Sequence, residues 1–172
     1  MMKTAQAYGE SEQRGEDMII ELAEDADAQA VLDLQRLAYV SEAELYNDYS
    51  IPPLTQTLEE MQSDFRRQVV YRATIDGRII GSVRGHLEDG TCHIGRLIVH
   101  PDFQNRGIGT ALMARVEQHF TDAVRFELFT GDISEHNLYL YGKLGYHVFD
   151  TKHLTDKVTI VLLEKSRDAD AQ

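Results

Sequence analysis

The sequence predicts an α/β fold in which one mixed, mostly antiparallel sheet carries helices on both faces. The first observation is an antiparallel meander, because Asp-Gly turns within 76–78 and 89–91 separate three apolar runs. The second is a change of pattern after residue 100, where helices and strands alternate as in a parallel βαβα unit. Because such crossovers pack their helices against the sheet, we expect the meander and the βαβα unit to form one mixed sheet.

Two elements are expected near the start of the domain. A short strand is expected over 18–23, "MIIELA". Apolar residues at helical spacing predict a helix over 25–40, and Asp25 or Asp27 is expected to cap it.

A capping box marks the start of the next helix. Thr57 and Glu60 have the spacing at which each side chain bonds the other's backbone amide, which predicts a helix over 57–65. The three strands of the meander follow at 69–75, 79–87 and 92–99.

The second half of the chain alternates. Leu112, Val116 and Phe120 lie four residues apart, as on one face of a helix. A later helix is expected to begin at Ser134 and to end at Gly145. The elements predicted here are helices over 109–120 and 134–146 and strands over 124–129, 146–151 and 158–165. Polar tails over 1–17 and 166–172 flank one domain over 18–165.

Composition restricts the class of protein. The chain has 172 residues, 42% hydrophobic and 27% charged, as one globular domain does. A formal net charge of −12 argues against binding of nucleic acids or anionic membranes. It either favours cationic small molecules or serves solubility alone. No apolar run reaches the ~20 residues of a membrane span, and no secretory signal is evident. With Cys92 as its single cysteine, the chain is expected in the cytoplasm.

Two glycines stand at the start of the 109–120 helix, where they add nothing to helix stability. Gly107 and Gly109 lie in "QNRGIG", between a strand and that helix. The first amides of a helix lack partners, and glycines allow an anion to approach them. This is neither a Walker A loop nor a dinucleotide fingerprint, since Thr110 follows Gly109 and position 112 is leucine. The alternatives are a phosphate site and a tight turn without a ligand.

A wider pattern favours the phosphate site. "RLIVHPDFQNRGIGTALM" (96–113) resembles the acetyl-CoA signature of the GNAT acetyltransferase superfamily. "NLYLYGKLGY" (137–146) resembles a later helix of that superfamily, and the two blocks occur in the expected order with one strand between them. The resemblance extends over about 18–165 and implies a GNAT-like fold.

The resemblance also implies a coenzyme A site. Backbone amides would bind the pyrophosphate at Gln104, Asn105, Arg106, Gly107, Ile108, Gly109 and Thr110. The pantetheine arm would pair with Leu97, Ile98 and Val99, whose strand is expected to splay from the next strand at a bulge. Asn137 would bond the cofactor, and Tyr141, one turn further on the same helix face, would donate a proton to the departing thiolate.

Acetyl transfer to an amine also requires proton removal, because the free amine has a pKa of ~10.4. His93 and Glu127 are the candidate bases. His93 is alternatively an exposed strand-end residue. Glu127 alternatively pairs with Arg84, Arg96 or another basic residue. A water relay would make neither residue indispensable.

In this superfamily, the segment at 39–54 lines the acceptor pocket. A cationic amine could be received by Glu42, Glu44, Tyr46, Asp48 and Tyr49. The alternative is a solvated loop with packed tyrosines.

No metal site is expected, because H-E-x-x-H spacing is absent and the cysteine is alone. The resulting hypothesis is an acetyl-CoA-dependent N-acetyltransferase, acting by direct attack in a ternary complex. The acceptor would be a primary amine on a small molecule, peptide or protein, and a homodimer is possible. The alternative is a non-catalytic module that senses acyl-CoA or a metabolite.

Overall fold

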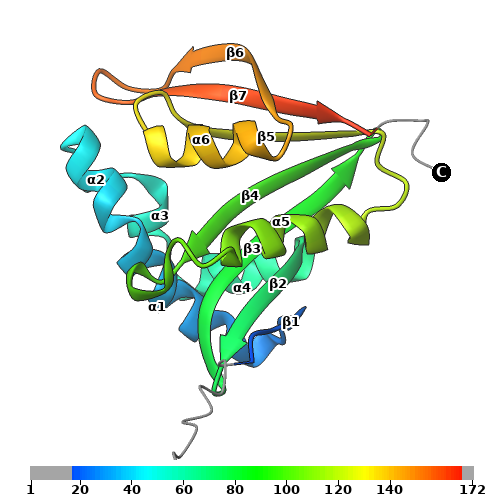
Figure 1. Ribbon diagram of the computed structural model, residues 1–172. Coiled ribbons are helices and arrows are strands. Elements are labelled where there is room, and N and C mark those ends of the chain that lie inside the picture. Colours follow the sequence, from blue (N-terminus) through cyan, green and yellow to red (C-terminus); the bar gives the residue numbers. More distant parts are fainter. Residues whose placement is uncertain (1–16, 168–172) are drawn as a thin grey trace, which may run out of the picture.

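The computed structural model describes residues 17–167, in which seven strands form one mixed sheet (Figure 1). The strands are β1 (Ile19–Leu22), β2 (Val69–Ile75), β3 (Arg78–Glu88), β4 (Thr91–Val99), β5 (Arg125–Gly131), β6 (His147–His153) and β7 (Thr159–Ser166). Their spatial order is β1-β2-β3-β4-β5-β7-β6. Only β4 and β5 pair in parallel among these strands; the other neighbours are antiparallel. The predicted mixed sheet is confirmed.

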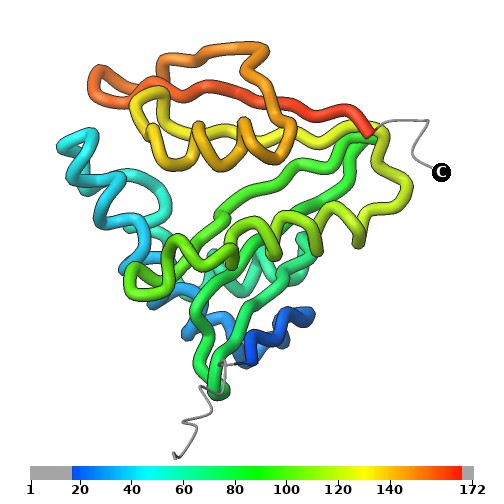
Figure 2. The backbone as a smooth tube through the Cα atoms, in the orientation of Figure 1, coloured from blue at the N-terminus to red at the C-terminus, as the bar shows by residue number. Residues whose placement is uncertain are grey.

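Helices cover both faces of the sheet, as predicted (Figures 1 and 2). The helical elements are η1 (Asp25–Asp27), α1 (Ala28–Ala38), α2 (Val40–Tyr46), α3 (Pro52–Thr55), α4 (Leu58–Arg67), η2 (Pro101–Phe103), α5 (Ile108–His119) and α6 (Glu135–Lys143). Helix α5 crosses β2, β3 and β4 on one face, and α1 and α4 lie on the other. Within the described residues, no helix is both long and apolar enough to cross a membrane.

Glycines in β3 let α5 lie close to the sheet. A Cβ on Gly81 would come within 3.0 Å of the Leu112 side chain, and one on Gly85 within 3.1 Å of Val116. Arg84 points to the opposite face, where its guanidinium contacts the Met61 sulfur. The main core therefore forms between the sheet and α5, and a smaller apolar cluster joins α1 to α4.

The local turn and cap predictions hold where the partners are close in sequence. Asp76, Gly77, Asp89 and Gly90 all have positive φ, as two-residue hairpin turns require. The capping box is present: the Thr57 hydroxyl accepts from the Glu60 amide at 3.2 Å, and the Glu60 carboxylate accepts from the Thr57 amide at 2.9 Å.

Two predicted cap residues, Asp27 and Ser134, occupy the N-cap positions of α1 and α6, but other partners take their side chains. Asp27 precedes α1, but its carboxylate accepts from the Glu24 amide at 2.7 Å and pairs with Arg72 at 2.9 Å. Asp25 lies inside η1, and Glu24 stands before it. Ser134 precedes α6 as expected, yet its hydroxyl donates to the Glu42 carboxylate at 2.6 Å instead of capping the helix.

The chain stays bound to the fold slightly beyond the predicted domain end. Strand β7 continues to Ser166, and the Arg167 guanidinium donates to the carbonyls of Glu117 and Thr121 at 2.8 Å. The predicted tails lie outside the described residues over 1–16 and 168–172.

Candidate functional site

Strands β4 and β5 separate after a short parallel ladder. They pair only from Thr91 to His93 on β4, opposite 125–127 on β5, and then diverge toward their carboxyl ends (Figure 1). At the same place the β3–β4 register shifts, and Arg96 has a left-handed φ of 48°. The predicted splay at a bulge is confirmed, and within the described residues it leaves β4 from 94 to 99 without a strand partner on that side.

The amino end of α5 faces the mouth of this split. Gly107 is its N-cap residue, with a φ of 79°, and no atom lies within 4 Å of where its Cβ would be. In the described part of the chain, the amides of 107–110 donate to no protein acceptor. The first amide of the helix to bond is that of Ala111, to the Gly107 carbonyl at 3.0 Å. The unpaired amides and the positive end of the helix dipole suit an anion.

One cleft, about 650 Å³ in volume, joins the open edge of β4 to this helix end. Besides these two elements, the α1–α2 segment and α6 form its walls. Ten residues with a predicted cofactor role line it, namely Leu97, Ile98, Val99, Gln104, Asn105, Gly107, Ile108, Gly109, Thr110 and Asn137. The Asn137 amide nitrogen donates to the Thr130 hydroxyl at 3.2 Å, which orients that side chain.

Two residues with a predicted cofactor-binding role, Arg106 and Tyr141, do not line the cleft. The Arg106 guanidinium lies 5.0 Å from the centre of the Phe103 ring. Tyr141 is buried, and its ring packs edge-on against Tyr146.

Tyr141 nevertheless lies within electrostatic reach of the cleft. Burial raises its pKa well above the usual range, and the nearby Tyr39 and Glu42, which both line the cleft, raise it further. Because a raised pKa favours the neutral form, the phenol carries its proton at neutral pH.

The two candidate bases are neighbours at the closed end of the split. His93 on β4 pairs with Glu127 on β5, the last pair before the strands part. The Glu127 carboxylate accepts from Arg125 at 2.6 Å, so its partner is another basic residue rather than Arg84 or Arg96. Neither His93 nor Glu127 lines the cleft.

The five residues expected to receive an amine do not meet in one pocket. Glu42 is the only carboxylate among the residues that line the cleft in the described structure. The Tyr46 hydroxyl donates to Asp132 and accepts from the Ile133 amide, both at 2.9 Å. Asp48 bonds Ser50, while Glu44 and Tyr49 are exposed.

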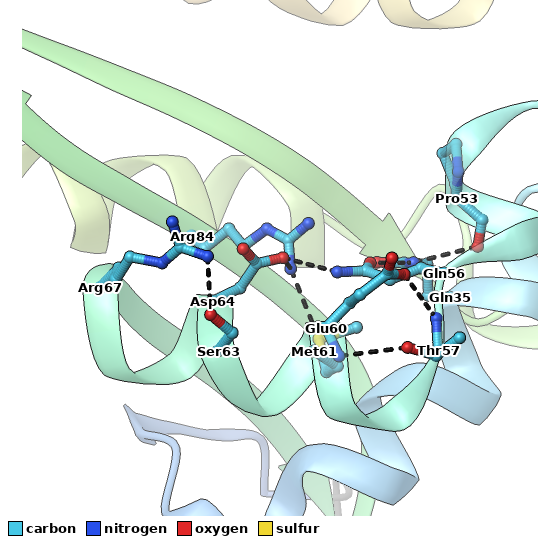
Figure 3. Close-up of polar contacts among 10 residues, drawn as sticks. All are labelled: Gln35, Pro53, Gln56, Thr57, Glu60, Met61, Ser63, Asp64, Arg67 and Arg84. Carbon is cyan, nitrogen blue, oxygen red and sulfur yellow. Dashed lines mark hydrogen bonds and ion pairs between the residues drawn. The ribbon is translucent and has the colours of Figure 1, made fainter.

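A polar layer supports the sheet beneath the bulge (Figure 3). The Arg84 guanidinium pairs with Asp64 at 3.1 Å, and Asp64 also accepts from Gln56. Gln56 in turn accepts from Gln35 at 2.9 Å. Burial lowers the pKa of Arg84 to about 10, Arg96 lowers it too, and Asp64 opposes the shift. Helices α1 and α4 are thereby tied to β3 beside the split.

Sequence reasoning missed one cluster. The hairpin cluster, consisting of His86, Glu88 and His93, holds three potential ligand atoms within 4.8 Å of one another. The two-residue turn at 89–90 fixes the pairing that brings them together. That turn was visible in the sequence, but a search for helical H-E-x-x-H spacing could not detect ligands paired across a hairpin.

Comparisons with known proteins agree with this geometry. The profile of the "Acetyltransferase (GNAT) family" matches residues 28–146. The PaiA N-acetyltransferase of Thermoplasma acidophilum, solved in complex with coenzyme A, superposes with a TM-score of 0.75 at 16% identity, over 88% of this chain and 99% of that one. The ribosomal-protein-S18-alanine N-acetyltransferase of Escherichia coli gives 0.73 at 14%, over 91% and 99%. At these identities the likeness concerns the fold.

Curated relatives match over part of their own length. The Bacillus subtilis protein YqkA, named as a UPF0157 protein, is 32% identical over 124 residues, which are 72% of this chain. The chain spans 36% of that protein's length and between 51% and 64% of the length of seven other curated relatives.

Proposed function

The chain belongs to the GNAT acetyltransferase family, and on that basis we propose that it transfers an acetyl group from acetyl-CoA to a primary amine. The acceptor is a small molecule or a peptide or protein amine. The amine attacks the thioester directly within a ternary complex, without a covalent enzyme intermediate. The observation that carries the proposal is that the open edge of β4 and the free amides of α5 lie in the same cleft.

The cleft offers a distinct group for each part of the donor. Amides from Gln104 to Thr110 bind the diphosphate at the positive end of α5. The backbone of Leu97, Ile98 and Val99 bonds the pantetheine amides in the manner of an added strand. Asn137, already oriented by Thr130, adds a side-chain hydrogen bond.

The proton transfers are assigned to Glu42, which lines the cleft, and to Tyr141, which is buried near Tyr39 and Glu42. The amine nitrogen bonds to the acetyl carbon and the C–S bond breaks. The thiolate takes a proton from Tyr141, and the surplus proton on the new amide nitrogen passes through water to restore the phenol. The Glu42 carboxylate, anchored by Ser134 at 2.6 Å, holds the ammonium and accepts its proton. A backbone amide near Val99 stabilises the oxyanion. His93 and Glu127 are the alternative bases, reached through water from the closed end of the split.

An amine panel tests the proposal directly. Acetyl-CoA is supplied with polyamines, amino acids, aminoglycosides and lysine or N-terminal peptides, and released thiol is measured. Cys92 does not disturb the assay, since burial raises its pKa to about 12 and keeps the thiol protonated. Turnover with at least one amine supports the proposal, and isothermal titration with coenzyme A checks donor binding independently.

A non-catalytic acyl-CoA or metabolite sensor is the second candidate. The observation that favours it is that both predicted bases lie outside the cleft, with Glu127 engaged by Arg125. Tight coenzyme A binding without thiol release on any acceptor would support the sensor and overturn the enzyme.

A further inference from the structure

The hairpin cluster lies apart from the cleft, on the β3–β4 hairpin. His86 on β3 pairs directly across the ladder with His93 on β4, and their rings stack with centroids 5.0 Å apart. Glu88 lies two residues after His86, so its side chain leaves the same face of the sheet. None of the three lines the cleft.

The two-residue turn makes this arrangement rigid. Residues 89 and 90 both have left-handed backbone, and Glu88 pairs with Thr91 directly beside them. The register of the hairpin is therefore fixed by its own turn rather than by distant contacts. The three potential ligand atoms lie within 4.8 Å of one another in the folded chain.

One imidazole nitrogen of the cluster lacks a partner. Within the described residues, His86 Nδ1 is buried from solvent and makes no hydrogen bond. Buried polar atoms are nearly always paired, so an orphaned one needs an explanation. Coordination of a cation would give the His86 imidazole a polar partner.

The neighbouring charges leave the cluster free to act as a ligand set. Glu127, opposite His93 on β5, is engaged by Arg125 at 2.6 Å. Arg125 also binds Glu164 at 2.6 Å, so both carboxylates are already engaged by one guanidinium. Glu88 is exposed beside the turn and, within residues 17–167, forms no ion pair.

The geometry points to a binding site for one Zn²⁺-class divalent ion, held by His86, Glu88 and His93 with at least one further position open to solvent. Two imidazoles and one carboxylate suit Zn²⁺, Co²⁺ or Ni²⁺ better than Mg²⁺ or Ca²⁺. Imidazole nitrogens on one tetrahedral Zn²⁺ lie about 3.4 Å apart, from Zn–N bonds of about 2.1 Å. The separation of at most 4.8 Å therefore closes by side-chain tilting alone.

Isothermal titration of the full chain, without an affinity tag and freed of metal by a chelator, tests the site with ZnCl₂. We expect one Zn²⁺ per chain. His86→Gln should weaken binding by more than about 100-fold, because loss of an outer-sphere partner alone costs 10- to 100-fold. Glu88→Gln lies on the exposed turn and keeps the fold, so it tests the site even if His86→Gln disturbs the sheet.

His147→Gln is the matched control. His147 is an exposed histidine on β6 that faces Glu164, and it does not belong to the hairpin cluster. Its Zn²⁺ affinity should equal that of the native chain. A visible absorption band on titration with Co²⁺, absent in Glu88→Gln, is the second readout. The site does not exist if the native chain fails to bind Zn²⁺, if Glu88→Gln binds as well as the native chain, or if His147→Gln loses binding to the same extent.

Discussion

Tyr46 of α2 lies directly over Gly131 at the end of β5. A Cβ on residue 131 would overlap the Tyr46 hydroxyl and come within 2.6 Å of the Tyr46 Cζ atom. The hydroxyl bonds Asp132 and the Ile133 amide, and burial, with Asp132 adding to the effect, raises its pKa to about 12. This contact joins α2 to the loop after β5, between residues 86 positions apart in the sequence.

Gly131→Ala should destabilise the protein by about 1–3 kcal/mol, because the methyl group displaces the Tyr46 ring and breaks its two hydrogen bonds. Urea unfolding measures the change. Gly142→Ala is the control, since no atom lies within 4 Å of that Cβ and alanine favours the helix by up to about 1 kcal/mol. In a Tyr46→Ala background the cost of Gly131→Ala should largely disappear. An unchanged cost there would show that Tyr46 is not the cause.

Gly107→Glu should bind coenzyme A at least about tenfold more weakly than Gly107→Gln, a difference of about 1.4 kcal/mol. Both side chains impose the same strain at a φ of 79°, but only glutamate repels the diphosphate. Isothermal titration gives the two affinities. Equal affinities would place the diphosphate elsewhere.

Tyr141→Phe should lower kcat by about 10²- to 10⁴-fold, the usual contribution of a general acid. The KM for acetyl-CoA should stay close to the native value, because the buried phenol does not line the cleft. Steady-state kinetics over a range of donor concentrations separates the two constants. A variant with native kcat would exclude Tyr141 as the proton donor.

The pH profile of the native enzyme should have no alkaline limb from Tyr141. Burial, together with Tyr39 and Glu42, raises the pKa of this phenol, so it keeps its proton to higher pH than a free tyrosine. The acceptor amine, with a pKa of ~10.4, gains its nucleophilic form as pH rises. We therefore expect kcat/KM to increase between about pH 6 and pH 9.5. If kcat/KM of the native chain fell within this range and Tyr141→Phe abolished that fall, Tyr141 would be losing its proton, which would contradict its raised pKa.

Glu42→Gln should raise the KM for a cationic amine and lower kcat, while the affinity for coenzyme A changes little. Glu42 is the carboxylate of the described cleft, whereas Glu44 on the same helix is exposed and supplies the matched control as Glu44→Gln. Kinetics at saturating acetyl-CoA compares the two variants. If the two behave alike, the amine is received elsewhere, and His93 and Glu127 become the residues to vary.

Features that depend on neighbours in the sequence could be predicted from it. The turns at 76–78 and 89–91 and the Thr57–Glu60 box involve partners at most three residues apart. Gly107 and Gly109 indicate the start of α5 for the same reason, because the conformation of a helix start depends on the local backbone.

Features that depend on partners distant in the sequence could not be predicted from it. Ser134 has the residue type of a helix cap, but Glu42, 92 residues away, takes its hydroxyl. Tyr46 was expected in an acceptor pocket and instead bonds a loop that follows β5. His93 and Glu127 lie 34 positions apart in the sequence, and only the register of the parallel ladder makes them neighbours.

The parting of β4 from β5 has a mechanical consequence. Within the described chain, three ladder pairs make up the strand pairing between β1–β4 and β5–β7, and side-chain packing makes up the rest of the junction. An extended ligand bound between β4 and β5 would connect the two groups of strands. Binding of this ligand should slow amide hydrogen exchange in β1–β4 and in β5–β7 together, including segments that the ligand does not contact.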